Sequence, residues 1–316
     1  MGNETCKNGV GVIKRSNVPN LLLIGFPRCG TTAFAQALNK HPSISVCEPK
    51  EPHFLAFEGS GRCIEGPGSE AFGPDRVYDY DRWSAMFSCM TSLLKCDASV
   101  STITYPETSI PNIEKYCGGD VKIIVMLRDP IERAYSSYLY NSSRGWNAGT
   151  FEQGLDLERH RRVEGWSHLW FYEYLSQYEN RIEPFIESFG RSSIHFVLME
   201  EFTKKPSLCL TKCFEFLGVQ NVRIDTSSSV NVGGKPKSEY LAVAMNRLRR
   251  YPLVVNAIKK VTSSSMRETV RGYNLERQAP PTYVFDRLSP ELLGTYEWAG
   301  DLCSEVSEYW RNPCKC

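Results

Sequence analysis

The feature that most constrains this chain is a short apolar run that leads through a glycine-bearing turn into a helix. The run Asn20-Leu-Leu-Leu-Ile-Gly25 is continuously apolar after its first residue, which is typical of a strand buried on both faces. A helix is expected over Thr31–Asn39, ending before His41-Pro42. A strand, a turn and a helix in this order direct backbone N–H groups and the positive helix end at one point, where an anion can bind.

Two more apolar runs, Val121–Leu127 and Ser193–Met199, are expected to be strands. Buried strands that alternate with helices predict an α/β fold: a single domain with a central parallel sheet, helices on both faces and a P-loop-like phosphate-binding loop. Helices are expected at about 130–140, 168–188 and 205–217, and a surface loop is expected at 58–76. Residues 1–18 are expected to be a loose leader, and residues 19–316 to form one domain. The tail of this domain, 238–310, is expected to be mostly helical with a break near 278–281.

Composition removes several classes of function. The 37 basic and 36 acidic residues give a net charge of +1, so nucleic acid is not an expected partner. No window approaches the run of about 18 apolar residues that a membrane span needs, and residues 1–14 lack the apolar stretch of a signal peptide. The twelve cysteines form no Cys-x-x-Cys pair, so we expect buried free thiols and no metal site.

The turn Gly25-Phe-Pro-Arg-Cys-Gly-Thr-Thr32 carries the densest chemistry. Its two glycines have the P-loop spacing, but Thr31 stands where a P-loop ATPase has lysine. The cation is instead Arg28, and with the two threonine hydroxyls it suits a phosphosulfate held without a metal. A small side chain suffices at position 29, where a catalytic thiol is not expected. The predicted anion site consists of Arg28, Cys29, Gly30, Thr31 and Thr32.

A second cation follows the second expected strand. Arg128 lies where that strand ends, and Pro130 is suited to the first turn of the next helix. Ser136 lies eight residues after Arg128, about two turns into the helix. A guanidinium and a hydroxyl so spaced can jointly hold a second phosphate.

With both motifs present in this order, the sequence strongly resembles the sulfotransferases that use PAPS (3′-phosphoadenosine 5′-phosphosulfate). Pro27-Arg-Cys-Gly-Thr-Thr32 matches their 5′-phosphosulfate loop, and Arg128 with Ser136 matches their 3′-phosphate motif. The resemblance covers roughly residues 20–220. It implies transfer of a sulfuryl group from PAPS to an acceptor hydroxyl or amine, with PAP as the product and no metal required.

A third motif is similar to one of the heparan-sulfate-type carbohydrate sulfotransferases. Glu48-Pro-Lys-Glu-Pro-His-Phe54 is similar to their KEPHF stretch, and by that resemblance Glu51 is the candidate general base, with His53 as the alternative. The two prolines beside Glu51 are expected to hold its backbone extended. Arg28, which cannot usefully donate a proton, is expected to stabilise charge on the leaving phosphate.

The sequence departs from the heparan type at two places. Those enzymes usually have lysine where Arg28 stands, and their acidic-basic patch is not recognisable in Asp97–Thr102. This weakens the expectation of a polysaccharide, so the acceptor is expected to be a small molecule or a carbohydrate. Lys235 and Lys237 lie in a glycine-rich basic segment that is expected to close over the nucleotide; an exposed loop is an equally weighted alternative.

Two other functions account for part of the pattern. A P-loop kinase or NTPase would need a lysine after Gly30 and an acidic Mg²⁺ partner, whereas Asp129 follows Arg128. A non-catalytic nucleotide-binding module would bind PAP without depending on Glu51 or His53. The expected compartment is the cytoplasm; the Golgi lumen is the alternative if the chain is a fragment that lacks its anchor.

Overall fold

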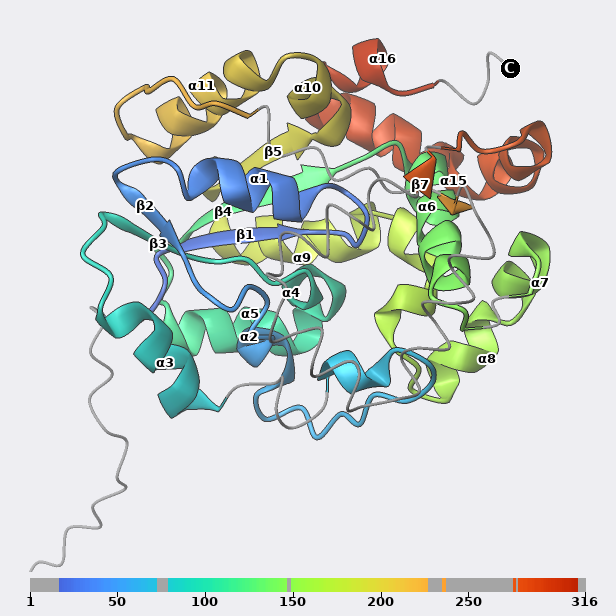
Figure 1. Ribbon diagram of the computed structural model, residues 1–316, viewed down its shortest axis with the longest axis horizontal. Helices are drawn as coiled ribbons and strands as arrows, with labels where there is room; N and C mark the ends of the chain where they lie inside the picture. Colours follow the sequence, from blue (N-terminus) through green and yellow to red (C-terminus); the bar gives the residue numbers. More distant parts are fainter. Residues whose placement is uncertain are drawn as a thin grey trace, which may run out of the picture.

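A computed structural model describes residues 17–72, 79–146, 149–226, 235–236, 275–276 and 278–311. Its centre is a five-stranded parallel sheet of order β2-β3-β1-β4-β5 (Figure 1). The sheet confirms the predicted fold class and the three predicted strands. The strands are β1 (Leu21–Gly25), β2 (Ile44–Val46), β3 (Leu94–Asp97), β4 (Lys122–Leu127) and β5 (Ile194–Leu198).

The central strands are apolar because helices cover both faces of the sheet. β1 is buried along its whole length and β4 everywhere after its first residue, as expected for a parallel sheet with two covered faces. One face carries α1 (Thr31–Leu38), α10 (Met199–Lys204) and α11 (Pro206–Leu217), and the other carries α3 (Tyr80–Ser88), α4 (Ser101–Thr104) and α5 (Pro106–Tyr116) (Figure 1).

Strands β2 and β3 were not predicted from the sequence. β2 has three residues and β3 has four, and each contains a polar residue, Ser45 and Lys95 respectively. Runs this short lack a periodic pattern. They form as strands because β3 can pair with both β1 and β2.

Seven further α-helices lie within the described ranges, and those of residues 130–163 lie beyond the carboxyl ends of the strands (Figure 1). They are α2 (Phe54–Phe57), α6 (Pro130–Ser143), α7 (Phe151–Asp156), α8 (Glu158–Val163), α9 (Glu179–Phe189), α15 (Thr282–Leu302) and α16 (Val306–Tyr309). A short antiparallel pair, β6 (Lys235–Pro236) and β7 (Leu275–Glu276), lies beside α6.

The predicted helix over 168–188 is wrong in its first half. Two short 3₁₀ turns form at His168–Trp170 and Tyr174–Ser176, and the α-helix begins only at Glu179. The cause is the buried carboxylate of Glu158, which accepts the backbone N–H groups of residues 172, 173 and 174 at 2.8–2.9 Å. A side chain that captures backbone donors in this way replaces the helical hydrogen bonds.

Other expectations fall partly outside the described residues. The loop over 58–76 contains a 3₁₀ turn at Ser69–Phe72, and residues 73–78 are not described. The leader is described only from residue 17, and most of 238–277 is likewise outside the description. The nine described cysteines are all free, and five of them are buried. Within the described ranges, no helix combines the length and apolar character that crossing a membrane requires.

Candidate active site

The two predicted anion sites meet because their strands are neighbours. β1 pairs with β4, with Gly25 opposite Met126, so the turns that follow these strands begin side by side. The chain leaves β1 for the β2–β3 side of the sheet and later occupies the β4–β5 side. In open parallel sheets, ligands bind at the carboxyl ends of the strands beside such a change of direction.

The turn after β1 needs its two glycines for different reasons. A Cβ atom at Gly25 would lie 2.8 Å from the carbonyl oxygen of Met126, so only glycine allows this close approach. Gly30 caps α1 with φ of 84°, in the left-handed region that glycine adopts without strain. No side chain caps α1, and the N–H groups of its first turn therefore remain for a ligand.

Arg28 lies between the other two predicted phosphate ligands. Its Nε donates to Ser136 Oγ at 3.2 Å, and its carbonyl oxygen lies 3.4 Å from Arg128 Nη1. Among the described residues, no carboxylate forms an ion pair with Arg28. Burial lowers the pKa of Arg28, and the charges of Arg128 and Arg144 lower it further. Three arginine charges are thus close together, and none of the described carboxylates forms an ion pair with Arg28.

Arg128 is buried and only partly satisfied. Its Nη2 donates to Glu132 Oε2 at 2.9 Å, four residues further along the chain. Its Nε is buried and has no hydrogen-bond partner among the described atoms. An unsatisfied buried donor costs about 1–3 kcal/mol, which an anion at this position would recover. The structure thus brings Arg28, Arg128 and Ser136 together, although each of the last two contacts Arg28 rather than the other.

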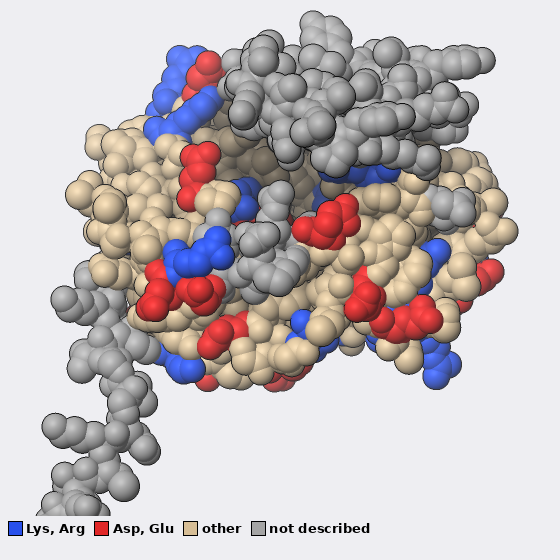
Figure 2. Space-filling view, turned by 60° about the horizontal axis from the view of Figure 1, so that its bottom comes forward, with Lys and Arg blue, Asp and Glu red and all other residues tan. Residues whose placement is uncertain are grey.

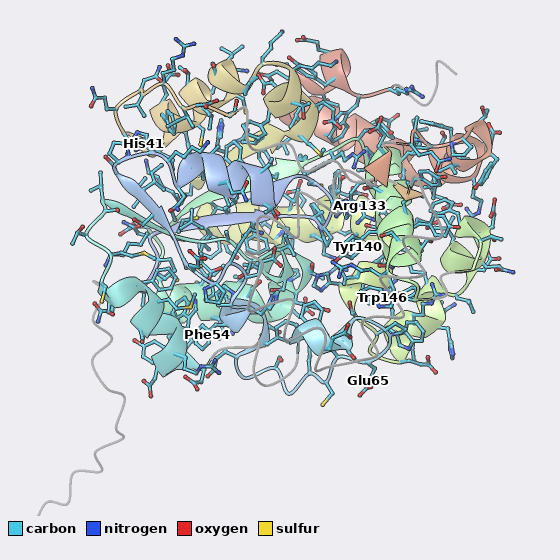
Figure 3. The ribbon with its side chains drawn as sticks, in the orientation of Figure 1. His41, Phe54, Glu65, Arg133, Tyr140 and Trp146 are labelled. Carbon is cyan, nitrogen blue, oxygen red and sulfur yellow. The ribbon has the colours of Figure 1, made fainter. Side chains whose placement is uncertain are left out.

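Sequence reasoning missed two residues on the same helix as Ser136. Tyr140 and Arg144 follow it at intervals of four residues, so the three share one face of α6. The guanidinium carbons of Arg28 and Arg144 lie 4.9 Å and 4.7 Å from the centre of the Tyr140 ring, which lies near Trp146 and Arg133 in Figure 3. This interval is visible in the sequence and was the signal that could have found them.

The same face of α6 also carries a buried cation, three residues before Ser136. Arg133 is fully buried, and its guanidinium donates to Ser176 Oγ at 2.8 Å and to the carbonyl oxygens of Phe171 and Tyr172. These acceptors are neutral, so the charge of Arg133 is not cancelled by them. Burial nevertheless raises the pKa of Cys29 to about 12, so this residue is a thiol and not a nucleophile.

Glu51 and His53 follow β2, and the predicted extended backbone at Glu51 is wrong. Both residues are left-handed, with φ of 66° and 60°. The chain turns here to enter α2, whose N-cap is His53, and this requirement overrides the preference that Pro52 imposes on Glu51. Left-handed residues other than glycine cost about 1–3 kcal/mol and cluster at functional sites.

The carboxyl group of Glu51 is held in its charged form. Lys50 Nζ lies 2.5 Å from Glu51 Oε1. Burial raises the pKa of Glu51, but the charge and hydrogen bond of Lys50, with a further contribution from nearby His53, outweigh burial and bring the pKa below its usual value. At neutral pH Glu51 is therefore a carboxylate, the form that can accept a proton.

The segment after β3 supports His53. The Nδ1 atom of His53 lies 2.9 Å from Ser101 Oγ, and the backbone N–H of His53 donates to Ser99 Oγ at 3.4 Å. Ser99 in turn donates to Asp97 Oδ1 at 2.7 Å. These residues lie in the stretch that shows no recognisable acidic-basic patch, and no pattern in the sequence reveals their role. Within the described residues, no hydrogen bond joins Glu51 or His53 to Arg28.

Lys235 and Lys237, the last two predicted nucleotide ligands, lie largely outside the described residues. The backbone of Lys235 lies in β6, opposite Glu276 in β7, and β6 lies beside α6. The side chain of Lys235 and the whole of Lys237 lie outside the described residues. Their closure over a nucleotide stays a prediction.

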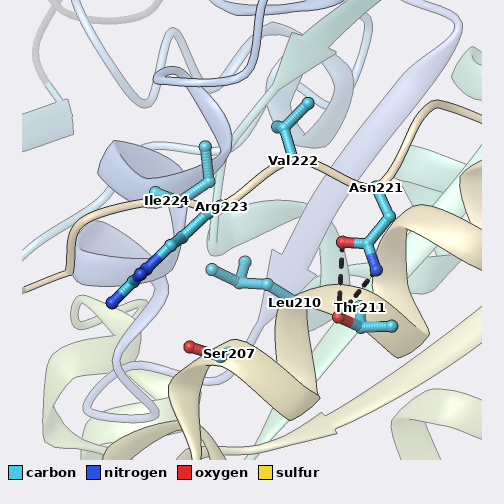
Figure 4. A pocket seen from close by; sticks show the side chains of 7 residues that line it. All are labelled: Ser207, Leu210, Thr211, Asn221, Val222, Arg223 and Ile224. Atoms are coloured by element: carbon cyan, nitrogen blue, oxygen red, sulfur yellow. Dashed lines mark hydrogen bonds between the residues drawn. The ribbon is translucent and has the colours of Figure 1, made fainter.

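The described part of the chain has hollows at more than one place. The space-filling view shows one with Lys or Arg side chains on its inner wall (Figure 2). Another is a pocket of about 420 Å³ between α11 and residues 221–224 (Figure 4). The segment 221–224 that lines this pocket is anchored next to α1, because His41 Nε2 lies 2.8 Å from the carbonyl oxygen of Gln220. The pocket contains none of the predicted site residues.

Comparison with known proteins gives one family and several relatives. A family model described as "Sulfotransferase domain" matches residues 18–232. Carbohydrate sulfotransferase 15 of Mus musculus is 28% identical over 165 residues, which cover 43% of this chain and 29% of that protein. Heparan sulfate glucosamine 3-O-sulfotransferase 3B1 of Mus musculus is 26% identical over 208 residues, which cover 66% of this chain and 48% of that protein. The chain thus spans less than half the length of either relative.

One solved structure is similar in both fold and sequence. The crystal structure of a sulfotransferase from Alicyclobacillus acidocaldarius matches with a TM-score of 0.63 and 26% identity. The match covers 79% of this chain and 98% of that one.

Proposed function

The chain belongs to the sulfotransferase domain family, and on this premise we propose that it transfers a sulfuryl group from PAPS to a hydroxyl or amine of a carbohydrate acceptor. The observation that carries the proposal is the buried Nε of Arg128, which has no described partner, beside an Arg28 that has no described acidic partner. The two anionic ends of one nucleotide, a 3′-phosphate at Arg128 and a 5′-phosphosulfate at Arg28, would satisfy these groups. A P-loop kinase or NTPase is not favoured.

Each predicted residue has a distinct part in binding the donor. Arg128 and Ser136 hold the 3′-phosphate, which distinguishes PAPS from ATP. Arg28 and the uncapped first turn of α1, with the hydroxyls of Thr31 and Thr32, hold the 5′-phosphosulfate. Arg144, on the face of α6 that Ser136 and Tyr140 share, adds positive charge beside them.

The transfer is a direct in-line displacement. Bound PAPS supplies the sulfuryl group. The bond from the acceptor oxygen or nitrogen to sulfur forms as the bond between sulfur and the phosphate oxygen breaks, and PAP leaves with the electron pair. Glu51 accepts the acceptor proton, with His53 as the alternative base. Arg28 and the loop N–H groups stabilise the charge that develops on the leaving phosphate, where preorganised donors have their largest effect.

A carbohydrate acceptor is proposed because the names of the relatives specify carbohydrate and heparan sulfate glucosamine substrates. The small-molecule alternative rests on the departure from the heparan type at Asp97–Thr102 and on the near-neutral net charge; the net charge does not describe the local field of the site. A cytoplasmic location, with the Golgi lumen as the alternative, is tested by microscopy of the tagged full-length chain. The requirement for no metal, and one domain over 19–316, also stay predictions.

Calorimetric titration with PAP, AMP and ATP, in EDTA, tests the nucleotide site. We expect PAP to bind at least about tenfold more tightly than AMP, because only PAP has a 3′-phosphate. Release of PAP from PAPS is then measured with glycosaminoglycan oligosaccharides and with a simple phenol. Equal affinity for PAP and AMP would exclude the proposed function, and release with the phenol alone would exclude the carbohydrate acceptor.

A non-catalytic nucleotide-binding module is the second outcome of the same assay. That protein would prefer PAP over AMP but release no PAP from PAPS with any acceptor. Replacement of Glu51 and His53 would then leave its function unchanged.

A further inference from the structure

The peptide unit that joins Arg128 to Asp129 is held at both of its polar groups by side chains from other elements. Its carbonyl oxygen accepts from the hydroxyl of Tyr178 at 2.7 Å. Its N–H donates to Glu200 Oε1 at 3.1 Å. Tyr178 is fully buried and Glu200 is partly buried, and together they fix the end of β4 at the point from which the Arg128 side chain departs.

The C-terminal segment binds the next side chain in the sequence. Asp129 is the N-cap of α6, and its Oδ1 accepts from the hydroxyl of Tyr296 at 2.9 Å as well as from N–H groups of that helix. Its Oδ2 accepts from the backbone N–H of Arg311 at 3.2 Å. Residues 282–311 lie beyond the family match, which ends at residue 232.

Trp310 connects all of these groups. Its Nε1 donates to Glu200 Oε2 at 3.2 Å. Its ring centre lies 6.1 Å from that of Tyr178 and 5.9 Å from that of Tyr296. The buried side chain of Trp310 therefore packs on Tyr178 and Tyr296 and bonds to Glu200. These three partners of Trp310 fix the Arg128–Asp129 turn.

We propose that Tyr296 and Trp310 are positioning residues for the 3′-phosphate of the bound nucleotide. Their side chains bond to Asp129 and Glu200 and act through these two residues on the main chain that carries Arg128. The inference rests on the proposed function, because it assumes that Arg128 binds this phosphate. A binding group must be held within about 0.5 Å of its productive geometry, and these contacts supply that support.

The test is a comparison of PAP and AMP affinities in single-group deletions. Tyr296→Phe removes only the hydroxyl, and Trp310→Phe removes the indole donor but keeps an aromatic ring. We expect each to weaken PAP binding about tenfold and to leave AMP binding unchanged, because AMP has no group for Arg128 to bind. Trp298→Phe is the matched control: the Nε1 of Trp298, on the same helix, donates to Glu183 Oε1 at 2.5 Å, away from Asp129.

The outcomes separate the positioning role from the proposed function. Wild-type protein that binds PAP and AMP equally overturns the proposed function itself. If the wild-type protein prefers PAP, the variants decide the positioning role alone. Folded variants that keep the preference for PAP, or that lose PAP and AMP affinity in parallel, overturn that role. Thermal unfolding of each variant reports folding. The two variants remove different atoms, so a failure of one to fold leaves the other to decide.

Discussion

The nucleotide side and the acceptor side of this site are built on opposite principles. Arg28 and Arg128 follow the two central, fully covered strands, and positive charges gather there without enough described acids to balance them. Glu51 follows the edge strand β2, and its carboxylate is already paired with Lys50. The first side is thus ready for an anion, whereas the second must release or share a partner when it acts.

The largest effect is expected at Glu51. Glu51→Gln removes the proton acceptor but keeps the shape, so kcat should fall at least about 100-fold while the affinity for PAP is unchanged. Steady-state kinetics and PAP calorimetry on the same protein measure both. His53→Asn is the comparison: a larger loss of kcat there than in Glu51→Gln would make His53 the base.

The next largest effect is expected at the nucleotide side. Arg128→Ala removes a buried charged donor, and PAP affinity should fall about 30–100-fold while AMP affinity is retained. Calorimetry with both ligands measures the difference. An equal loss for PAP and AMP would show that Arg128 maintains the fold of the turn and does not read the 3′-phosphate.

Lys50 should affect the pH dependence of the acceptor side. Glu51 with a lowered pKa keeps its proton-accepting form down to mildly acidic pH, so kcat should stay level from pH 8 to about pH 5. In Lys50→Met, burial acts without the lysine charge, and the acid limb of kcat should move to higher pH by about 1 unit.

The smallest expected effect concerns stability at Asp129. Burial raises the pKa of its carboxyl group to about 6. A raised pKa gives stability that is complete below the unfolded value of about 4 and is lost as pH rises through about 6. Relative to Asp129→Asn, the wild-type free energy of unfolding should therefore fall by about 1 kcal/mol between pH 5 and pH 7. Urea unfolding at both pH values measures this, and a difference that does not change with pH would contradict it.

The same contrast explains what the sequence could predict. Continuous apolar runs mark β1, β4 and β5. Because β1 and β4 are parallel neighbours, the residues that follow them lie together at the carboxyl ends of the strands. The positions of Arg28 and Arg128 after these two strands could therefore be predicted from the sequence. The family resemblance identified Glu51 as a candidate, but its left-handed backbone follows from tertiary contacts and not from the flanking prolines.

Other features were hidden because distant segments create them. The support of His53 by Ser99 and Ser101 depends on the short strand β3, which has no periodic pattern. The 3₁₀ turns at 168–176 depend on a carboxylate at position 158. Arg144 was visible as a helical interval from Ser136, yet only the stacking on Tyr140 shows that it lies beside Arg28.

The buried guanidinium of Arg133 has a consequence for how the protein responds to ionic strength. Dissolved ions screen charges that water can reach, with a Debye length of about 8 Å at physiological salt, and screen buried charges much less. Arg28 and Arg144 are partly exposed, whereas Arg133 is fully enclosed and its charge still acts on Cys29 in the loop. Added salt should thus remove only part of the attraction for an anion, and affinity should level off at high salt because this enclosed charge persists.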